Sequence, residues 1–189
     1  MPLNGDAMSD TLDRLLDAAE SGIRVKGYHA VSFRELADKL AIKSASVHYY
    51  FRAKEDLGLA LVERYRDRFF EALELAEARR RTPHDRIRAF VQLYRDALVD
   101  DDRICLCGML GAESCGLPPT LAAAVASFFQ DNIDWLVDNL PKELSPALRR
   151  KRARHIVATL QGAMTLAASL GDHRIFDDAV QDLSASWMR

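Results

Sequence analysis

Apolar residues recur with the period of an α-helix along nearly the whole chain, and no segment alternates apolar and polar residues as a half-buried strand would. In the first stretch they stand three or four residues apart, at Leu12, Leu15, Leu16, Ala19 and Ile23. This spacing places them on one face of a helix. The sequence therefore predicts an all-α fold.

Capping residues mark where the helices end and begin. Gly27 is expected to close the first helix. Ser32, with Glu35 three residues later, forms a capping box that predicts a second helix over residues 33–40. Two later helices are predicted to open where an N-cap residue precedes a proline, at Thr82-Pro83 and Ser145-Pro146.

A third, short helix is expected soon after the second, in the stretch SASVHYYF from Ser44 to Phe51. A helix, a tight turn and a short helix, with an earlier helix packed behind them, describe a helix-turn-helix unit. Its inner face is predicted to consist of Leu36, Ala37, Leu40, Ile42, Val47 and Phe51. The small residues and adjacent rings left outside can enter a major groove and hydrogen-bond to bases and phosphates.

The distribution of charge agrees with this interpretation. The net charge of -2 gives no global sign of a nucleic-acid partner. Between Ser21 and Lys54, however, seven basic residues stand against two acidic ones, a formal +5, so the remainder carries -7. This division suits a nucleic-acid-binding end on an acidic body.

The compartment is inferred from features that the sequence lacks. No apolar run approaches the roughly 18 to 20 residues of a membrane span, and the first residues do not read as a signal peptide. The three cysteines, an odd number, are expected to be free thiols. We therefore expect a cytoplasmic protein without a membrane partner.

Residues 27–57, GYHAVSFRELADKLAIKSASVHYYFRAKEDL, resemble the N-terminal signature of the tetracycline-repressor (TetR) family of one-component bacterial regulators. The shared parts are a Gly-aromatic pair, a Ser/Thr cap, Leu/Ile-Ala in the second helix, a Tyr-aromatic-Phe ending and Lys-Glu-x-Leu. The departures are Ala41 where the turn usually has Gly, Lys43 where Ser or Thr is common, and His48 where Tyr is usual. The resemblance implies a three-helix DNA-binding domain at residues 9–53 and a ligand-binding and dimerisation domain at residues 54–189.

The resemblance also implies which residues touch double-stranded operator DNA. They are Ser32, Arg34, Lys43, Ser44, Ala45, Ser46, His48, Tyr49, Tyr50 and Lys54. Lys54 matches the lysine that meets a phosphate from the start of the fourth helix, where the helix dipole adds to its charge. Val47 and Phe51 are assigned to the core, and for Tyr50 a core position and a DNA contact are equally expected. A helical hairpin that does not bind DNA is the alternative.

The remaining two thirds are expected to hold dimerisation and signal input. One long helix from Lys54 to about Arg81 carries an inner face of Leu57, Leu61, Tyr65, Phe69 and Leu73. Small residues in the segment Ala153 to Leu170, and an amphipathic helix after Gly171 that includes Trp187, suit a four-helix bundle between two subunits, as the family forms. A purely intramolecular core is the alternative to this homodimer.

The segment CLCGMLGAESCGLPP, from Cys105 to Pro119, is the most unusual part of this region. Cys105 and Cys107 would face about 200° apart on a helix, so they cannot hold one metal together. The pattern Cys105-Leu-x-Gly-x-Leu-x-x-Glu113 resembles a family branch whose repressors respond to electrophiles or small unsaturated compounds through a cysteine. A helix beginning there would lower the pKa of the Cys105 thiol. Buried cysteine acting as an inert apolar residue is the alternative.

The candidates for binding or sensing a small-molecule effector are Cys105, Cys107, Glu113, Phe69, Tyr94, Phe128 and Trp135, although aromatic residues at helical spacing are usually plain core. No histidine stands at metal-ligand spacing, so no metal and no cofactor are expected. These features predict a homodimeric transcriptional regulator, most simply a repressor released by a small ligand or thiol-reactive electrophile. A helical cysteine-dependent enzyme and a DNA-independent adaptor are the rival functions.

Overall fold

The computed structural model describes residues 4–78, 82–99 and 103–187, and this part of the chain is helical without a strand. Its elements are α1 (Asn4–Lys26), α2 (Phe33–Leu40), α3 (Ser44–Tyr50), α4 (Lys54–Ala78), α5 (Pro83–Val99), α6 (Leu106–Ala112), the 3₁₀ turn η1 (Ser114–Gly116), α7 (Pro119–Asn139), α8 (Pro146–Leu170) and α9 (Arg174–Trp187). The predicted all-α fold is therefore confirmed. The predicted end of the long helix at Arg81 lies outside the described residues.

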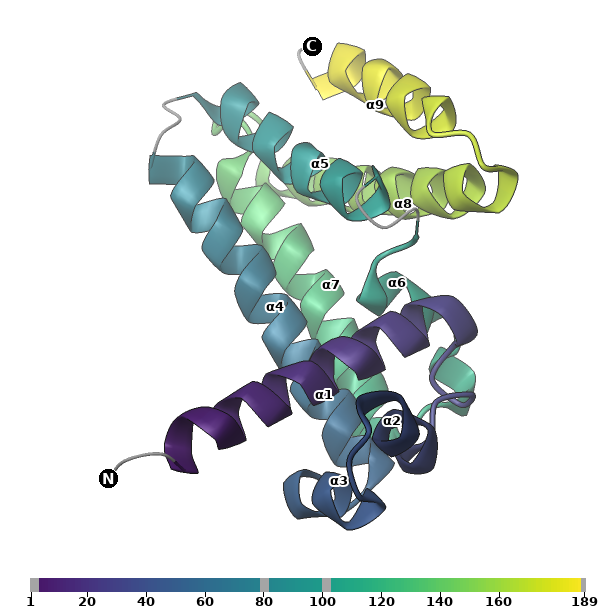
Figure 1. Cartoon of the computed structure of the whole chain (residues 1–189). Coiled ribbons are helices and arrows are strands. Elements are labelled where there is room, and N and C mark those ends of the chain that lie inside the picture. The colour runs from purple at the N-terminus through teal and green to yellow at the C-terminus, as the bar shows by residue number, and fades with distance from the viewer. Residues whose placement is uncertain (1–3, 79–81, 100–102, 188–189) are drawn as a thin grey trace.

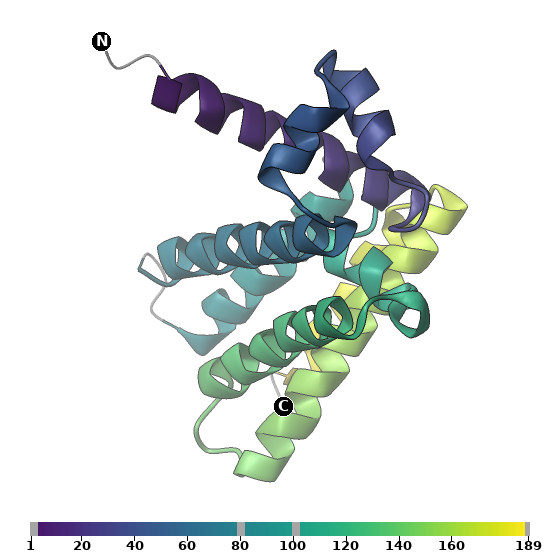
Figure 2. The same cartoon turned by 90° about the horizontal axis from the view of Figure 1, so that it is seen from below.

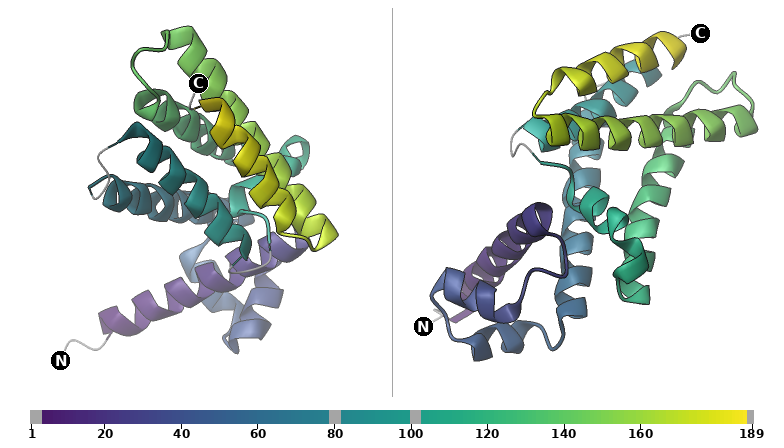
Figure 3. Two further views of the ribbon diagram at one scale, coloured as in Figure 1. Left: turned by 90° about the horizontal axis from the view of Figure 1, so that it is seen from above. Right: turned by 90° about the vertical axis from the view of Figure 1, so that its right-hand side faces the viewer.

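The helices form two ends joined by a central pair (Figure 1). α4 and α7 run side by side along the length of the molecule, and α1 crosses their lower ends together with α2 and α3. Viewed from below, α1 to α3 lie together at one end, where α1 also packs against α4 and α6 (Figure 2). At the opposite end α5, α8 and α9 pack together, with α8 and α9 adjacent along their lengths (Figure 3).

The predicted helix boundaries are confirmed by hydrogen bonds of the capping residues. Ser32 Oγ accepts a hydrogen bond from the Glu35 backbone N–H at 3.2 Å and so opens α2. Gly27, with φ 85°, follows the last residue of α1. Pro83 and Pro146 begin α5 and α8 as expected, with Thr82 and Ser145 capping the two helices through their hydroxyl oxygens.

Ala41 closes α2 in the left-handed region, at φ 54° and ψ 40°. Its backbone N–H bonds to the Asp38 carbonyl, and the Ile42 N–H bonds to the Ala37 carbonyl at 3.0 Å. The turn therefore requires the positive φ for which glycine is usual, and Ala41 carries a conformational cost of roughly 1 kcal/mol there.

Two groups of buried apolar side chains build the interior. One joins α1 to α4 with α6 and α7, and the other joins α4, α5, α7, α8 and α9. Both are flanked by the same four partly buried rings: Tyr65, Phe69, Phe70 and Phe129. The predicted inner face of α4 is confirmed, since Leu57, Leu61 and Leu73 are at most 2% exposed. α4 thus takes part in both groups.

The C-terminal helices are buried on one side only. α8 buries Ala153, Ile156, Leu160, Ala163 and Ala167, among others, while Leu166 and Leu170 are 55% and 69% exposed. α9 buries Phe176 and Leu183, and the side chain of Trp187 lies outside the described residues. In the described part of the chain, no helix is both long and apolar enough to span a bilayer.

Candidate nucleic-acid interface and internal cavity

α3 is held in place by its two inner apolar residues. Val47 is fully buried and Phe51, just after the helix, is 6% exposed, so their assignment to the core is confirmed. Lys43 precedes the helix in an extended conformation, and its side chain makes no capping hydrogen bond. The anchoring of α3 from below leaves its other side available for a partner.

The residues expected to contact DNA lie at this end of the molecule with varied exposure. Ser32, Arg34, Lys43, Ser44, Ala45, His48 and Tyr49 are exposed, whereas Ser46, Tyr50 and Lys54 are half-buried. Tyr49 is 71% exposed, and its ring meets the Tyr50 ring edge-on at 5.2 Å between centroids. His48 meets Phe33 edge-on at 5.0 Å. Neighbouring rings therefore hold the exposed rings of α3 in place.

Lys54, the first residue of α4, is fixed by the loop between α1 and α2. Its Nζ donates a hydrogen bond to the His29 carbonyl oxygen at 3.1 Å and lies 4.5 Å from the centroid of the Tyr28 ring. Partial burial lowers the pKa of Lys54, while the charges of Glu113 and Glu35 oppose that shift. The ammonium group therefore has a defined position at the start of α4.

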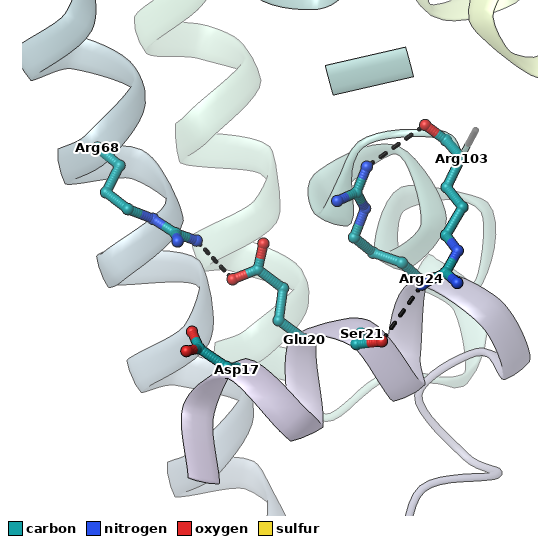
Figure 4. Close-up of a pocket in the computed structure, with 6 residues that line it drawn as sticks. All are labelled: Asp17, Glu20, Ser21, Arg24, Arg68 and Arg103. Atoms are coloured by element: carbon teal, nitrogen blue, oxygen red, sulfur yellow. Dashed lines mark hydrogen bonds and ion pairs between the residues drawn. The ribbon is translucent and has the colours of Figure 1, made fainter. Parts of the chain in front are cut away.

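Arg24 does not belong to the basic surface, although the sequence count included it. The residue is 8% exposed, and its guanidinium donates to the carbonyl oxygens of Ile104 at 3.0 Å and Ala97 at 2.9 Å. It also donates to the Arg103 carbonyl, while the Arg103 guanidinium donates to Ser21 Oγ at 3.2 Å (Figure 4). Arg24 thus joins α1 to the segment before α6, and the local charge facing outward is smaller than +5.

Four of the candidate effector residues come together around a narrow internal space. Its lining consists of Tyr65, Phe69, Leu93, Tyr94, Ala97, Cys105 and Phe128. No part of this space is wide enough to hold a water molecule. A ligand would therefore have to part the helices before it could enter.

Cys105 is the N-cap of α6 and is 3% exposed. Its Sγ accepts hydrogen bonds from the Gly108 N–H at 3.1 Å and from Gln161 Nε2 at 3.4 Å. Burial nevertheless raises the pKa of the Cys105 thiol, and the hydrogen bonds from Gln161 and Gly108 offset this only in part. The expectation of a lowered pKa is wrong, because loss of water around the sulfur outweighs the donors at the start of the helix.

The other two cysteines lie elsewhere. Cys107 is fully buried in the apolar group that includes α1 to α3, whereas Cys105 belongs to the other group, so the two face apart as expected. Burial also raises the pKa of Cys107, well above its usual range. Cys115 is exposed in η1, and all three thiols are free.

Cys107, Glu113 and Trp135, the other three candidates for binding or sensing an effector, do not line this internal space. Trp135 stacks on Phe90 at 5.4 Å between centroids. Glu113 caps the C-terminal end of α6 and accepts a hydrogen bond from the Tyr28 N–H at 2.8 Å. Its contact is with the DNA-binding end of the chain.

The sequence interpretation missed two polar residues around the cavity. Gln161 of α8 bonds to Cys105, and Asn132 accepts a hydrogen bond from the Tyr94 hydroxyl at 3.2 Å. Gln161 stands between small and apolar residues and Asn132 stands among the polar residues Gln130, Asp131 and Asp134, so neither carries a motif that marks it in the sequence. Among the described residues, no group of three or more His, Cys, Asp or Glu side chains is arranged to hold a metal ion.

Two family models match the chain in succession. Residues 15–61 match the model described as bacterial regulatory proteins of the tetR family. Residues 83–182, more than half of the 189, match the model for the C-terminal domain of LmrA/YxaF-like transcriptional regulators. Together they cover both the helix-turn-helix end and the helices around the internal cavity.

Similar proteins include regulators with solved structures. The chain is 32% identical to the transcriptional regulator AcuR of Cereibacter sphaeroides over 114 residues, 59% of this chain and 52% of that protein. It is 30% identical to the transcriptional repressor NemR of Escherichia coli over 129 residues, 65% of this chain and 63% of NemR. The matches thus span about half to two thirds of these relatives. The crystal structure of a TetR transcriptional regulator from Legionella pneumophila superposes with a TM-score of 0.89 at 26% identity, covering 98% of this chain and 99% of that one.

Proposed function

The chain belongs to the tetR family of bacterial regulatory proteins, and we propose that it represses transcription as a homodimer on a pseudo-palindromic operator. The observation that carries this proposal is the exposed surface of α3 above its buried anchors, Val47 and Phe51. Small residues at the start of that helix allow close approach to a major groove, and Tyr49 and His48 present hydrogen-bonding groups to it. The relative NemR is named as a transcriptional repressor, which supports repression as the direction of regulation.

A homodimer is supported by the uncovered side of α8. Leu166 and Leu170 are more than half exposed, and a side chain added at Gly162 would meet nothing within 4 Å. A second copy packed there would remove these apolar side chains from water. Leu166→Glu should therefore shift the protein from dimer to monomer in sedimentation. Leu75→Glu, at the 66% exposed Leu75 of α4, is the matched control and should leave the dimer intact.

The operator test uses duplexes with two half-sites whose spacing is varied. A two-fold dimer with one recognition helix per subunit should bind best when the half-site centres lie about 34 to 36 Å apart. Fluorescence titration at several salt concentrations, with a scrambled duplex as control, measures this preference. Equal affinity for all spacings, or tight binding of a monomer to a lone half-site, would contradict the proposal.

We further propose that a small molecule entering the narrow internal space beside Cys105, or an electrophile that modifies this thiol, releases the DNA. The support is the enclosure by Tyr65, Phe69, Tyr94 and Phe128, since added bulk must displace packed helices. The comparison is operator binding by wild type, Cys105→Ser, Cys107→Ser and Cys115→Ser with and without a thiol-reactive electrophile. Undiminished release in Cys105→Ser would exclude this thiol, and release in none would leave a reversible ligand.

A further inference from the structure

The end of α6 touches the loop between α1 and α2 at two points. Glu113 Oε2 accepts the Tyr28 N–H at 2.8 Å, and a methyl group on Gly27 would collide with the Glu113 carboxylate. One turn later, a methyl group on Gly116 would come within 3.2 Å of the His29 ring. The loop therefore fits closely against residues 113–116 and has no room to shift toward them.

The same loop also contacts Lys54. The carbonyl that accepts the Lys54 ammonium belongs to His29, and the ring beneath that ammonium belongs to Tyr28. Tyr28 is 4% exposed, and the His29 ring meets it edge-on. A continuous set of contacts thus runs from Glu113 through Tyr28 and His29 to Lys54.

We propose that Glu113 is a positioning residue for DNA binding, because it holds the Tyr28–His29 loop in the orientation that places the Lys54 ammonium. This inference rests on the proposed function, in which Lys54 meets a DNA phosphate. The contact spans 85 residues of sequence and joins the end of α6 directly to the DNA-binding end of the chain. This route reaches only the first residue of α4, Lys54, and does not run along the length of that helix.

The N-terminal end of α6 connects the Glu113–Tyr28 contact to the proposed effector site. Cys105, the N-cap of α6, lies beside the internal space, and Arg24 donates to the carbonyl oxygens of the two residues before it. A rigid movement of this short helix must therefore change its contact with α1, with Glu113, or with both. Loss of the Glu113 bond would release the loop and, with it, the fixed position of Lys54.

Electrostatic repulsion and the positioning role predict opposite effects of removing Glu113 on the affinity for DNA. Deleting a carboxylate near DNA reduces repulsion and by electrostatics alone should tighten binding. If Glu113 positions Lys54, its deletion should weaken binding instead. Asp38→Ala is the matched control, because Asp38 is an exposed carboxylate on α2 and its removal should only tighten binding.

The experiment measures the operator affinity of the full chain between 50 and 200 mM salt, a range over which phosphate contacts dominate the change. Glu113→Ala should bind several-fold more weakly, with a salt slope reduced by about one, as expected for one lost phosphate contact. Glu113→Asp, which keeps the charge but is too short, should do the same. Glu113→Gln should restore the wild-type slope, because its amide oxygen still accepts the Tyr28 N–H.

The double variant Lys54→Ala/Glu113→Ala separates this role from general loss of structure. Because both substitutions remove the same contact between Lys54 and a DNA phosphate, the double variant should bind no more weakly than Lys54→Ala alone. Unchanged slopes in Glu113→Ala and Glu113→Asp, or losses that add in the double variant, would overturn the inference. Failure of the wild type to bind any operator duplex would instead overturn the proposed function.

Discussion

The molecule gathers aromatic side chains in two regions that treat them in opposite ways. On α3, Tyr49 and His48 are exposed although each contacts a neighbouring ring. In the interior, Tyr94 is 2% exposed, and the rings around it enclose a space that water cannot enter. Contacts between rings therefore do not distinguish the two regions. The regions differ in what else surrounds the rings, which is solvent on α3 and packed side chains in the interior.

The comparison separates stability from recognition. The interior rings stabilise the fold through the apolar area that they bury, so their replacement should be costly for folding. The α3 rings bury little, so their replacement should affect mainly what the surface binds. The following variants test either the stability of the fold or the recognition of a partner.

The largest effect is expected in the interior. Phe128 is 1% exposed and contacts Tyr65, Phe69, Phe70 and Phe129 at 5.5 to 6.5 Å between centroids. Phe128→Ala should lower the free energy of unfolding by about 3–5 kcal/mol, measured by urea denaturation. Tyr49→Ala should change it by less than about 0.5 kcal/mol. Similar losses for both variants would remove the distinction between the regions.

At the DNA-binding end, two kinds of contact should separate by mutation. Lys54→Ala should weaken binding to every duplex and reduce the salt slope by about one, while Ser46→Ala or His48→Ala should change the preference among bases, by about 1–3 kcal/mol per contact. Titrations with matched and mismatched operators measure both quantities. A salt slope that is unchanged in Lys54→Ala would show that its ammonium does not meet a phosphate.

The cysteines offer a chemical test of the same division. Burial raises the pKa of the Cys105 and Cys107 thiols, so their thiolate fractions rise only above the usual thiol range of about 8.5. Exposed Cys115 should therefore be alkylated first at pH 7, and labelling of Cys105 should accelerate as the pH is raised. Mass spectrometry of timed samples gives the order. Cys105 reacting before Cys115 would mean that the interior opens readily.

The smallest effect is expected in the turn between α2 and α3. Ala41→Gly removes the strain of an alanine at φ 54° but adds freedom to the unfolded chain. The two terms largely offset each other, so the free energy of unfolding should rise by no more than about 1 kcal/mol. Urea denaturation measures it, with operator affinity as the control. A loss of stability would show that the alanine methyl group contributes packing.

The helix-turn-helix end was predictable because its determinants are local. The hydrogen bond from the Glu35 N–H to Ser32 Oγ spans three residues, and the two apolar anchors of α3, Val47 within it and Phe51 just after it, are four residues apart. Short-range patterns of this kind are visible in sequence. The cavity was predicted only in part, since aromatic spacing indicates burial without indicating which rings surround an empty space.

The contacts that sequence could not supply are long-range ones. Gln161 meets Cys105 across 56 residues, Arg24 meets Ile104 across 80, and each is a single polar side chain without a motif. The pKa of Cys105 shows the same limitation. Its place at the start of a helix was inferred correctly, but the burial that raises the pKa depends on packing by distant elements.

The four rings shared by the two apolar groups also determine how the chain should melt. Because Tyr65, Phe69, Phe70 and Phe129 pack against both groups, neither group can lose its structure without exposing part of the other. Heating should then give a single calorimetric peak covering both ends of the molecule. A compound that binds only the folded interior, present at one hundred times its dissociation constant, would stabilise the folded state by about 2.7 kcal/mol. The whole calorimetric peak would then move to a higher temperature. A library of small compounds could thus be screened for the effector by calorimetry alone, before any operator sequence is known.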